Sequence, residues 1–179
     1  ATVNLIDTGA ATDSVTVGAG FTSALAIDLD GGSVVNTVNA TNYTGALTVT
    51  ATIAEMASAV MVLTGGSGSD TLTVDLATAD NLVAADLATI TNFETFKTTD
   101  DNVTTLTLSE ANVTAGNTLT VNATSMLTTV LTFSGAAETS GSIDLSVAGT
   151  GDHVVTSLGN GNDTFTSTGT GAITVSAAL

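Results

Sequence analysis

The chain has 179 residues, with 17 acidic side chains against one basic side chain, which gives a formal net charge of −16. This balance excludes nucleic-acid binding, which needs basic side chains to neutralise phosphates, and an anionic membrane surface would repel the chain. The absence of cysteine excludes disulfides, thiolate metal sites and cysteine nucleophiles. Hydrophobic residues make up 43% of the chain, so we expect a folded domain despite the charge.

Short runs in which apolar residues alternate with Thr, Ser or Asn predict half-buried strands along the whole chain. Gly-rich or Asn/Asp-rich breaks separate these runs about every ten residues. In chain order the predicted strands are 13–17, 46–50, 70–74, 104–108, 117–121 and 143–147.

Two Ala/Leu-rich segments, 53–60 and 77–89, are the candidates for helix. Neither has a basic C-terminal turn or sustained length, so we expect a single turn or a loop in each. No apolar run is long enough to span a bilayer, and we expect no direct membrane insertion. The chain starts at Ala1 in strand-like sequence, which favours a fragment of a longer protein or a mature product.

An internal repeat indicates stacked units. The sequence Val-Asn-Ala-Thr at 38–41 recurs at 121–124, and Leu-Thr-Gly at 63–65 has a counterpart in Val-Ala-Gly at 147–149. Each copy leads into a Gly-rich loop, as expected when similar supersecondary units share a core. We interpret residues 1–92 and 93–179 as two β repeat units of one continuous stacked domain.

Two Gly-Asp loops carry the clearest chemical signal. Residues 65–72 read Gly-Gly-Ser-Gly-Ser-Asp-Thr-Leu, and residues 159–165 read Gly-Asn-Gly-Asn-Asp-Thr-Phe. Both follow the G-G-x-G-x-D-x-U-x pattern of calcium-binding β-helix repeats, the first of them fully. Glycines allow tight turns that aim carbonyl oxygens inward, and the aspartate adds a carboxylate, which together suit Ca²⁺.

Weaker versions of the loop occur at 149–155 and 8–15, where Asp152 and Asp13 stand at or near the carboxylate position. Residues 149–152 lie ten positions before 159–163, so the two could form a neighbouring pair of turns. Two further acidic segments, 28–33 and 100–102, are more simply interpreted as charged turns.

At these loops the chain resembles the RTX (repeats-in-toxin) superfamily of secreted calcium-binding proteins, particularly the branch of bacterial S-layer proteins and large adhesins. The segments Ile-Thr-Asn-Phe-Glu-Thr-Phe at 90–96 and Glu-Ala-Asn-Val-Thr-Ala-Gly-Asn-Thr-Leu-Thr-Val at 110–121 are similar to sequences downstream of such loops. The resemblance implies calcium held between loops of adjacent coils. The carbonyl ligands would be Gly66, Gly68, Gly159 and Gly161, and the carboxylate ligands would be Asp70, Asp163, Asp152 and Asp13.

No catalytic constellation is present in the sequence. His153 is the only imidazole, and no G-x-S-x-G motif occurs. Two carboxylates could in principle cleave a glycosidic bond, but the sequence has no accompanying aromatic residues on which a sugar would stack. We therefore expect no enzyme activity and no catalytic residue.

The fold expected is all-β, with short strands stacked as a parallel β-helix or β-roll, and a β-sandwich is the alternative. The function expected is that of a calcium-binding structural domain of a secreted bacterial cell-surface protein that self-assembles into a lattice, filament or adhesin repeat. Its partners would be further copies, with a surface glycan as a second candidate. Two alternatives stay open: an adhesin module whose threonine ranks bind ice or carbohydrate, and a noncatalytic RTX segment of a secreted enzyme.

Overall fold

The protein, described here from a computed structural model, is a β-solenoid of parallel strands. The structure describes residues 2–6, 13–30, 36–57, 61–75 and 80–176. The sequence-based prediction of stacked parallel coils is confirmed, and the β-sandwich alternative is wrong. Parallel pairing follows from the topology, because each coil passes once through the large sheet and returns through another sheet before it starts the next coil.

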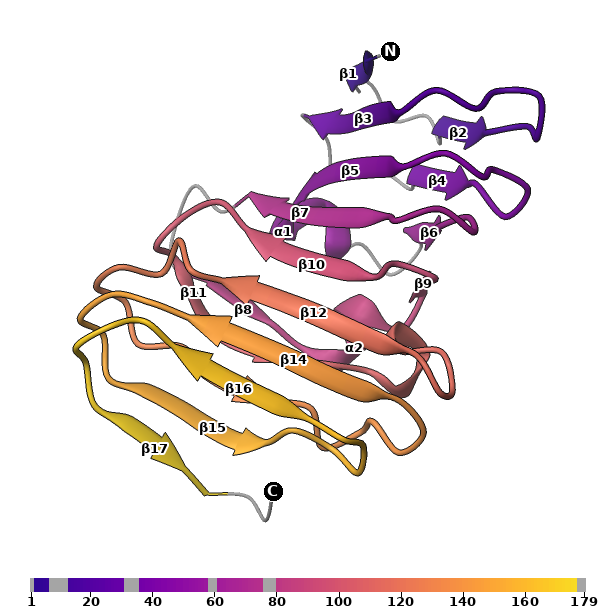
Figure 1. Ribbon diagram of the computed structural model, residues 1–179. Helices are drawn as coiled ribbons and strands as arrows, with labels where there is room; N and C mark the ends of the chain where they lie inside the picture. The colour runs from indigo at the N-terminus through magenta and orange to yellow at the C-terminus, as the bar shows by residue number, and fades with distance from the viewer. Residues whose placement is uncertain (1, 7–12, 31–35, 58–60, 76–79, 177–179) are drawn as a thin grey trace.

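The large sheet has eight strands and runs the length of the molecule. Figure 1 shows them stacked from the indigo N-terminal end to the yellow C-terminal end. In spatial order they are β1 (Thr2–Ile6), β3 (Leu25–Asp30), β5 (Leu47–Thr52), β7 (Thr71–Asp75), β10 (Thr95–Thr98), β12 (Thr118–Ala123), β14 (Ser142–Val147) and β16 (Thr164–Ser167).

Two smaller sheets complete the coils. The four-stranded sheet contains β2 (Asp13–Thr16), β4 (Asn36–Asn39), β6 (Val62–Thr64) and β9 (Ile90–Thr91). The five-stranded sheet contains β17 (Ile173–Val175), β15 (His153–Ser157), β13 (Thr132–Ser134), β11 (Val103–Thr107) and β8 (Asp80–Leu82).

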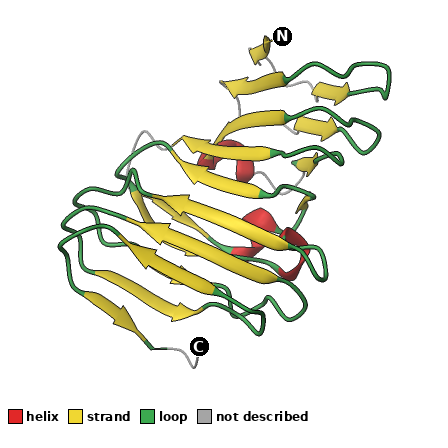
Figure 2. Ribbon diagram, in the orientation of Figure 1, coloured by secondary structure: helices red, strands yellow, loops and turns green. Residues whose placement is uncertain are grey.

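Among the described residues, helical structure is confined to single turns (Figure 2), two of which lie in the segments 53–60 and 77–89 where a single turn or a loop was expected. They are α1 (Ile53–Met56), α2 (Ala84–Leu87) and the 3-10 turn η1 (Glu110–Asn112). At α1, Thr52 and Glu55 form a reciprocal capping box, in which the Thr52 N–H donates to Glu55 Oε2 at 2.7 Å. No helix among the described residues is long and apolar enough to cross a membrane.

The core consists of side-chain ladders that continue from coil to coil. Since side chains alternate between faces along a strand, every second residue points inward, and in-register pairing stacks it on its counterpart in the next coil. One inward ladder of the eight-stranded sheet runs Ile27, Val49, Leu72, Phe96, Val121, Leu145 and Phe165. A ladder of the five-stranded sheet runs Leu82, Leu106, Phe133, Val155 and Val175.

The eight-stranded sheet includes strands from both of the repeat units expected at 1–92 and 93–179. The first Val-Asn-Ala-Thr copy begins within the end of β4 in the four-stranded sheet, and the second begins within the end of β12 in the eight-stranded sheet. The copies share a turn, because Asn39 and Asn122 each accept hydrogen bonds from the threonine two residues later. The division into two units stays a prediction.

Candidate functional site

The first Gly-Asp loop connects neighbouring coils through its carboxylate. Asp70 is fully buried, and its Oδ1 accepts the N–H of Leu47 in the preceding coil at 2.9 Å. Its Oδ2 accepts the N–H of Gly66 at 2.5 Å, and its own N–H donates to Glu94 Oε2 in the next coil at 2.7 Å. A calcium ion would have to compete with two N–H donors for this carboxylate.

The glycines of this loop are required by the close approach of the preceding coil. A Cβ on Gly66 would lie 2.1 Å from the Tyr43 carbonyl oxygen, and a Cβ on Gly68 would lie 2.2 Å from that of Gly45. Real side chains do not reach such distances, so these positions must be glycine for the turns to stack. Stacking alone therefore accounts for the glycine pattern, and the role of these carbonyls as calcium ligands stays a prediction.

The second Gly-Asp loop has the same stacking but a different hydrogen-bond arrangement. Asp163 is half-buried and its Oδ1 accepts the N–H of Ile143 at 2.8 Å, as Asp70 does with Leu47. A Cβ on Gly161 would lie 2.0 Å from the Gly141 carbonyl oxygen. The N–H of Gly159, however, donates to Ser157 Oγ at 3.2 Å, whereas the equivalent N–H of the first loop donates to its aspartate.

The weaker loop at 149–155 does not join the two Gly-Asp loops. Asp152 is exposed, and its Oδ1 accepts the N–H of Ala172 in the next coil at 2.8 Å. It precedes β15, whereas Asp163 precedes β16, so the loops at 149–152 and 159–163 occupy different corners of the solenoid. The expectation that these loops form a neighbouring pair of turns is wrong, because turns stack on the next coil, about 20 residues away. The side chain of Asp13 lies outside the described residues.

Other carboxylates connect coils in the same way, and sequence reasoning missed them as a class. Asp101 accepts the N–H groups of Leu127 at 2.8 Å, Thr128 at 2.7 Å and Thr129 at 2.9 Å. Burial acts to raise the pKa of Asp101, but these bonds together with one from the Thr128 hydroxyl lower it below its ordinary value. The sequence feature that could have indicated this role was the large number of acidic residues in predicted turns of a chain with one basic side chain.

Two glutamates meet at the corner before β14. Glu138 is fully buried, and its Oε1 accepts the N–H groups of Ser140 at 2.8 Å and Gly141 at 2.6 Å. Glu110 is exposed and accepts the N–H of Thr139 at 2.8 Å. The hydrogen bond from the Thr139 hydroxyl is the main cause that lowers the pKa of Glu110. The Ser140 hydroxyl lies 3.1 Å from Glu110 Oε1 and 3.3 Å from Glu138 Oε1, so it bridges the two carboxylates.

A polar hollow of about 290 Å³ opens at this corner. The residues that line it come from three turns that stack on one another: Gly116, Thr139, Ser140, Gly141, Ser142, Asn160, Gly161 and Asn162. The second Gly-Asp loop thus forms one side of the hollow and the Glu138 turn forms its neighbour.

A second hollow of about 140 Å³ lies beside acidic residues where strands of the eight-stranded sheet end, and it is lined in part by Asp28, Thr50 and Asp75. The pKa of Asp75 is raised, first by a hydrogen bond with the carboxyl group of Asp100 and then by burial. Two carboxyl groups in this arrangement favour sharing a proton.

His153 has a structural role in this arrangement. It is buried, its Nδ1 accepts the N–H of Leu131 at 3.2 Å, and its Nε2 lies 2.9 Å from the Ala148 carbonyl oxygen. Both ring nitrogens therefore have backbone partners.

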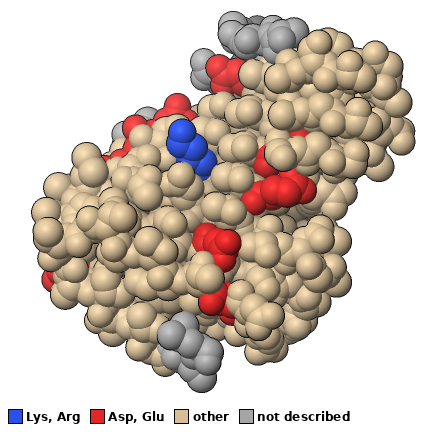
Figure 3. Space-filling model, in the orientation of Figure 1, with Lys and Arg blue, Asp and Glu red and all other residues tan. Residues whose placement is uncertain are grey.

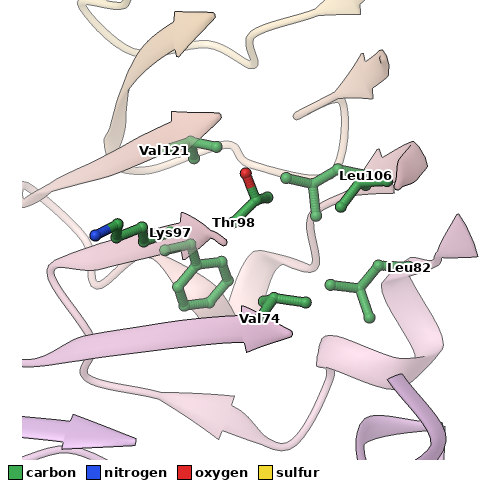
Figure 4. Close-up of a pocket in the computed structure, with 8 residues that line it drawn as sticks. Val74, Leu82, Lys97, Thr98, Leu106 and Val121 are labelled. Atoms are coloured by element: carbon green, nitrogen blue, oxygen red, sulfur yellow. The ribbon is translucent and has the colours of Figure 1, made fainter. Parts of the chain in front are cut away.

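The apolar void inside the solenoid is too small for a ligand. It measures about 10 Å³, and its lining includes Val74, Leu82 and Thr98 between the eight- and five-stranded sheets. Figure 4 shows Thr98 among apolar side chains, with the nitrogen of Lys97 pointing away from them.

The outer face of the eight-stranded sheet carries Lys97, the single basic side chain, and acidic side chains lie in several separate groups (Figure 3).

No group of three or more His, Cys, Asp or Glu residues suited to hold a metal ion occurs in the described part of the chain. No protein-family model, no curated protein and no solved structure matches the chain.

Proposed function

We propose that this chain is a structural segment of a secreted bacterial surface protein, and that its solenoid associates with further copies in a lattice, filament or adhesin repeat. The coil formed by β16 and β17 carries this proposal. Phe165 and Ile173 pack against the core but stay half-exposed, and Val175 is 40% exposed. A further coil on this edge would bury them and continue the ladders, as each preceding coil does for its neighbour.

The backbone of β16 offers a direct test of edge association. The N–H of Thr168 donates to the Val147 carbonyl oxygen at 3.1 Å, so the N–H of Ser167 points to the opposite edge of β16, where no described strand pairs with it. Proline at 167 removes only that outward donor and blocks strand addition. In sedimentation velocity the wild-type chain should associate and the Ser167→Pro variant should not. Ser167→Ala, which keeps the N–H group, is the control and should associate like the wild type. A wild-type chain that stays monomeric at high concentration contradicts the proposal.

The extracellular bacterial location rests on the resemblance of the Gly-Asp loops to RTX proteins, and so does calcium binding. Of the two loops, the second fits calcium better, because Asp163 is only half-buried and the loop residues Asn160, Gly161 and Asn162 before it line the larger polar hollow. Hard oxygen ligands suit this ion, which would add positive charge to a chain of net charge −16. Calorimetric titration with calcium chloride, comparing wild type with Asp163→Asn and Asp70→Asn, tests this part, and a calcium-indifferent wild type refutes it.

A second candidate function is binding of an ordered surface such as ice or a carbohydrate, and the register of the eight-stranded sheet favours it. Thr48, Thr71, Thr95 and Thr120 align in one outward rank over four neighbouring strands. In the next outward rank Thr50 and Thr73 lie between Asp28 on one side and Lys97 on the other. In-register strands space these hydroxyl groups about 4.7–4.9 Å apart.

This second candidate makes opposite predictions for two substitutions. Lys97→Thr extends the rank of Thr50 and Thr73 and should increase inhibition of ice recrystallisation, whereas Thr73→Lys should decrease it. Thr105→Lys, on the outer face of the five-stranded sheet, is the control. An absence of inhibition by both the wild type and Lys97→Thr eliminates ice as the ligand, and a glycan array then tests carbohydrate.

A further inference from the structure

The buried carboxylate of Glu138 has one oxygen in use and one without a partner. Its Oε1 accepts three hydrogen bonds, from the Ser140 N–H, the Gly141 N–H and the Ser140 hydroxyl. Its Oε2 is buried and has no hydrogen-bond partner among the described residues. Donors that converge on Oε1 are the pattern that stabilises a carboxylate anion, and an anion buried in this way needs a counter-charge.

The protein cannot supply that counter-charge from its own side chains. Lys97 is the only lysine or arginine of the chain, and it is exposed on the outer face of the eight-stranded sheet. The one histidine, His153, has both ring nitrogens paired with the backbone. The nearest ionisable partner of Glu138 in the hydrogen-bond network is a second acid, Glu110, which shares the Ser140 hydroxyl and thus adds negative charge.

The loop 159–163 of the next coil packs on this corner. The next turn packs directly on Glu138, since the Asn160 N–H donates to its carbonyl oxygen at 3.2 Å. A Cβ on Gly159 would lie 2.8 Å from the Glu138 carbonyl oxygen and 3.1 Å from its Cβ, so the loop approaches this residue too closely for a side chain at position 159. The polar hollow is lined by Thr139, Ser140 and Gly141, the three residues that follow Glu138 in the chain.

We propose that Glu138, together with Glu110, binds a hard divalent cation of the calcium class at the corner between the turn 138–142 and the loop 159–163. Carboxylate, hydroxyl and backbone carbonyl oxygens are the ligands that calcium prefers. This inference rests on the calcium part of the proposed function, and it assigns the ion to carboxylates outside the Gly-Asp pattern. Cation binding would also explain why a glutamate is buried in this turn, where an uncharged hydrogen-bond acceptor could accept the same N–H groups.

The test is calorimetric titration of the chelated chain with calcium chloride, with thermal unfolding followed in parallel and magnesium chloride as the comparison ion. Glu138→Gln keeps an acceptor for the N–H groups of the turn and should lower calcium affinity at least tenfold and remove the calcium-dependent rise in melting temperature. Glu110→Gln should weaken binding less. Glu55→Gln, at a buried capping glutamate of α1, is the control that should keep the full response.

Each outcome decides between the proposals. A full calcium response in Glu138→Gln that Asp163→Asn abolishes refutes the Glu138 site and leaves calcium binding by the Gly-Asp loop. No calcium response in the wild type refutes both. A Glu138→Gln variant that is more stable than the wild type with and without calcium refutes the inference, because it shows that a proton occupies the buried carboxyl group.

Discussion

Thr98→Val should stabilise the protein, because Thr98 places a hydroxyl group in the apolar interior. Thr98 is 4% exposed, its Oγ1 has no hydrogen-bond partner among the described residues, and it lines the void between the eight- and five-stranded sheets. It occupies the inward position that Val74 fills in the neighbouring strand. Valine has the same shape as threonine, so the substitution exchanges the hydroxyl for a methyl group without overpacking.

The expected gain follows from the cost of an unpaired buried hydroxyl, which is about 1–3 kcal/mol. For a chain of this size each kcal/mol raises the melting temperature by roughly 2–4 °C. Thermal and urea unfolding followed by circular dichroism should therefore show Thr98→Val melting roughly 2–12 °C higher, with an unchanged slope of the unfolding free energy against denaturant concentration. Thr98→Ser, which keeps the hydroxyl and loses a methyl group, should be destabilised by about 1 kcal/mol.

A Thr98→Val variant that is no more stable than the wild type would refute this reasoning and show that the hydroxyl is paired, for example with a water molecule in the void. A void of about 10 Å³ is close to the smallest that holds one water, but its lining is almost entirely apolar. Thr73→Val, on the outer face of the adjacent strand β7, is the matched control and should change stability by less than about 0.5 kcal/mol.

Three further predictions concern the carboxylates and glycines that join the coils. The pKa of Asp101 is lowered in the folded state, so its stabilisation is present above the ordinary value of 3.8 and is lost as the pH falls through the lower folded value. Asp101→Asn should remove this part of the acid dependence in unfolding measured from pH 2 to pH 7. The pKa of Asp75 is raised by its hydrogen bond with Asp100 and by burial, so its stabilisation is full below 3.8 and is lost as the pH rises through the folded value. Asp75→Asn should therefore raise the melting temperature at pH 7, and an unchanged value would show that the two carboxyl groups do not interact. Gly68→Ala should destabilise the solenoid by about 1–3 kcal/mol, while Gly18→Ala, which meets no atom within 4 Å, should be neutral or stabilising; equal effects would contradict the close approach of the coils.

The role of the carboxylates shows where sequence reasoning reached its limit. The pattern Gly-x-Gly-x-Asp indicated a turn with a functional carboxylate, and the structure has a turn with a buried carboxylate at Asp70. The sequence could not show that Leu47 and Gly66 present N–H groups to its two oxygens, because Leu47 belongs to another coil. Glu138 and Glu110 had no recognisable motif, and only stacking brings them to one hydroxyl.

The sequence by itself determined the all-β class, the approximate strands, the single helical turns and the stacked parallel architecture. These depend on local properties: side chains that alternate with period two, β-branched residues, and glycines at regular breaks. Only the tertiary structure decided which turns stack on one another and which carboxylate oxygens accept hydrogen bonds from backbone N–H groups. Strands of one coil pair with residues about 20 to 25 positions away, so the contacts of each turn are made with residues distant in the sequence. For this reason loops that read alike, at 65–72 and 159–165, differ in how their glycine N–H groups are used, and the loop at 149–152 lies at another corner.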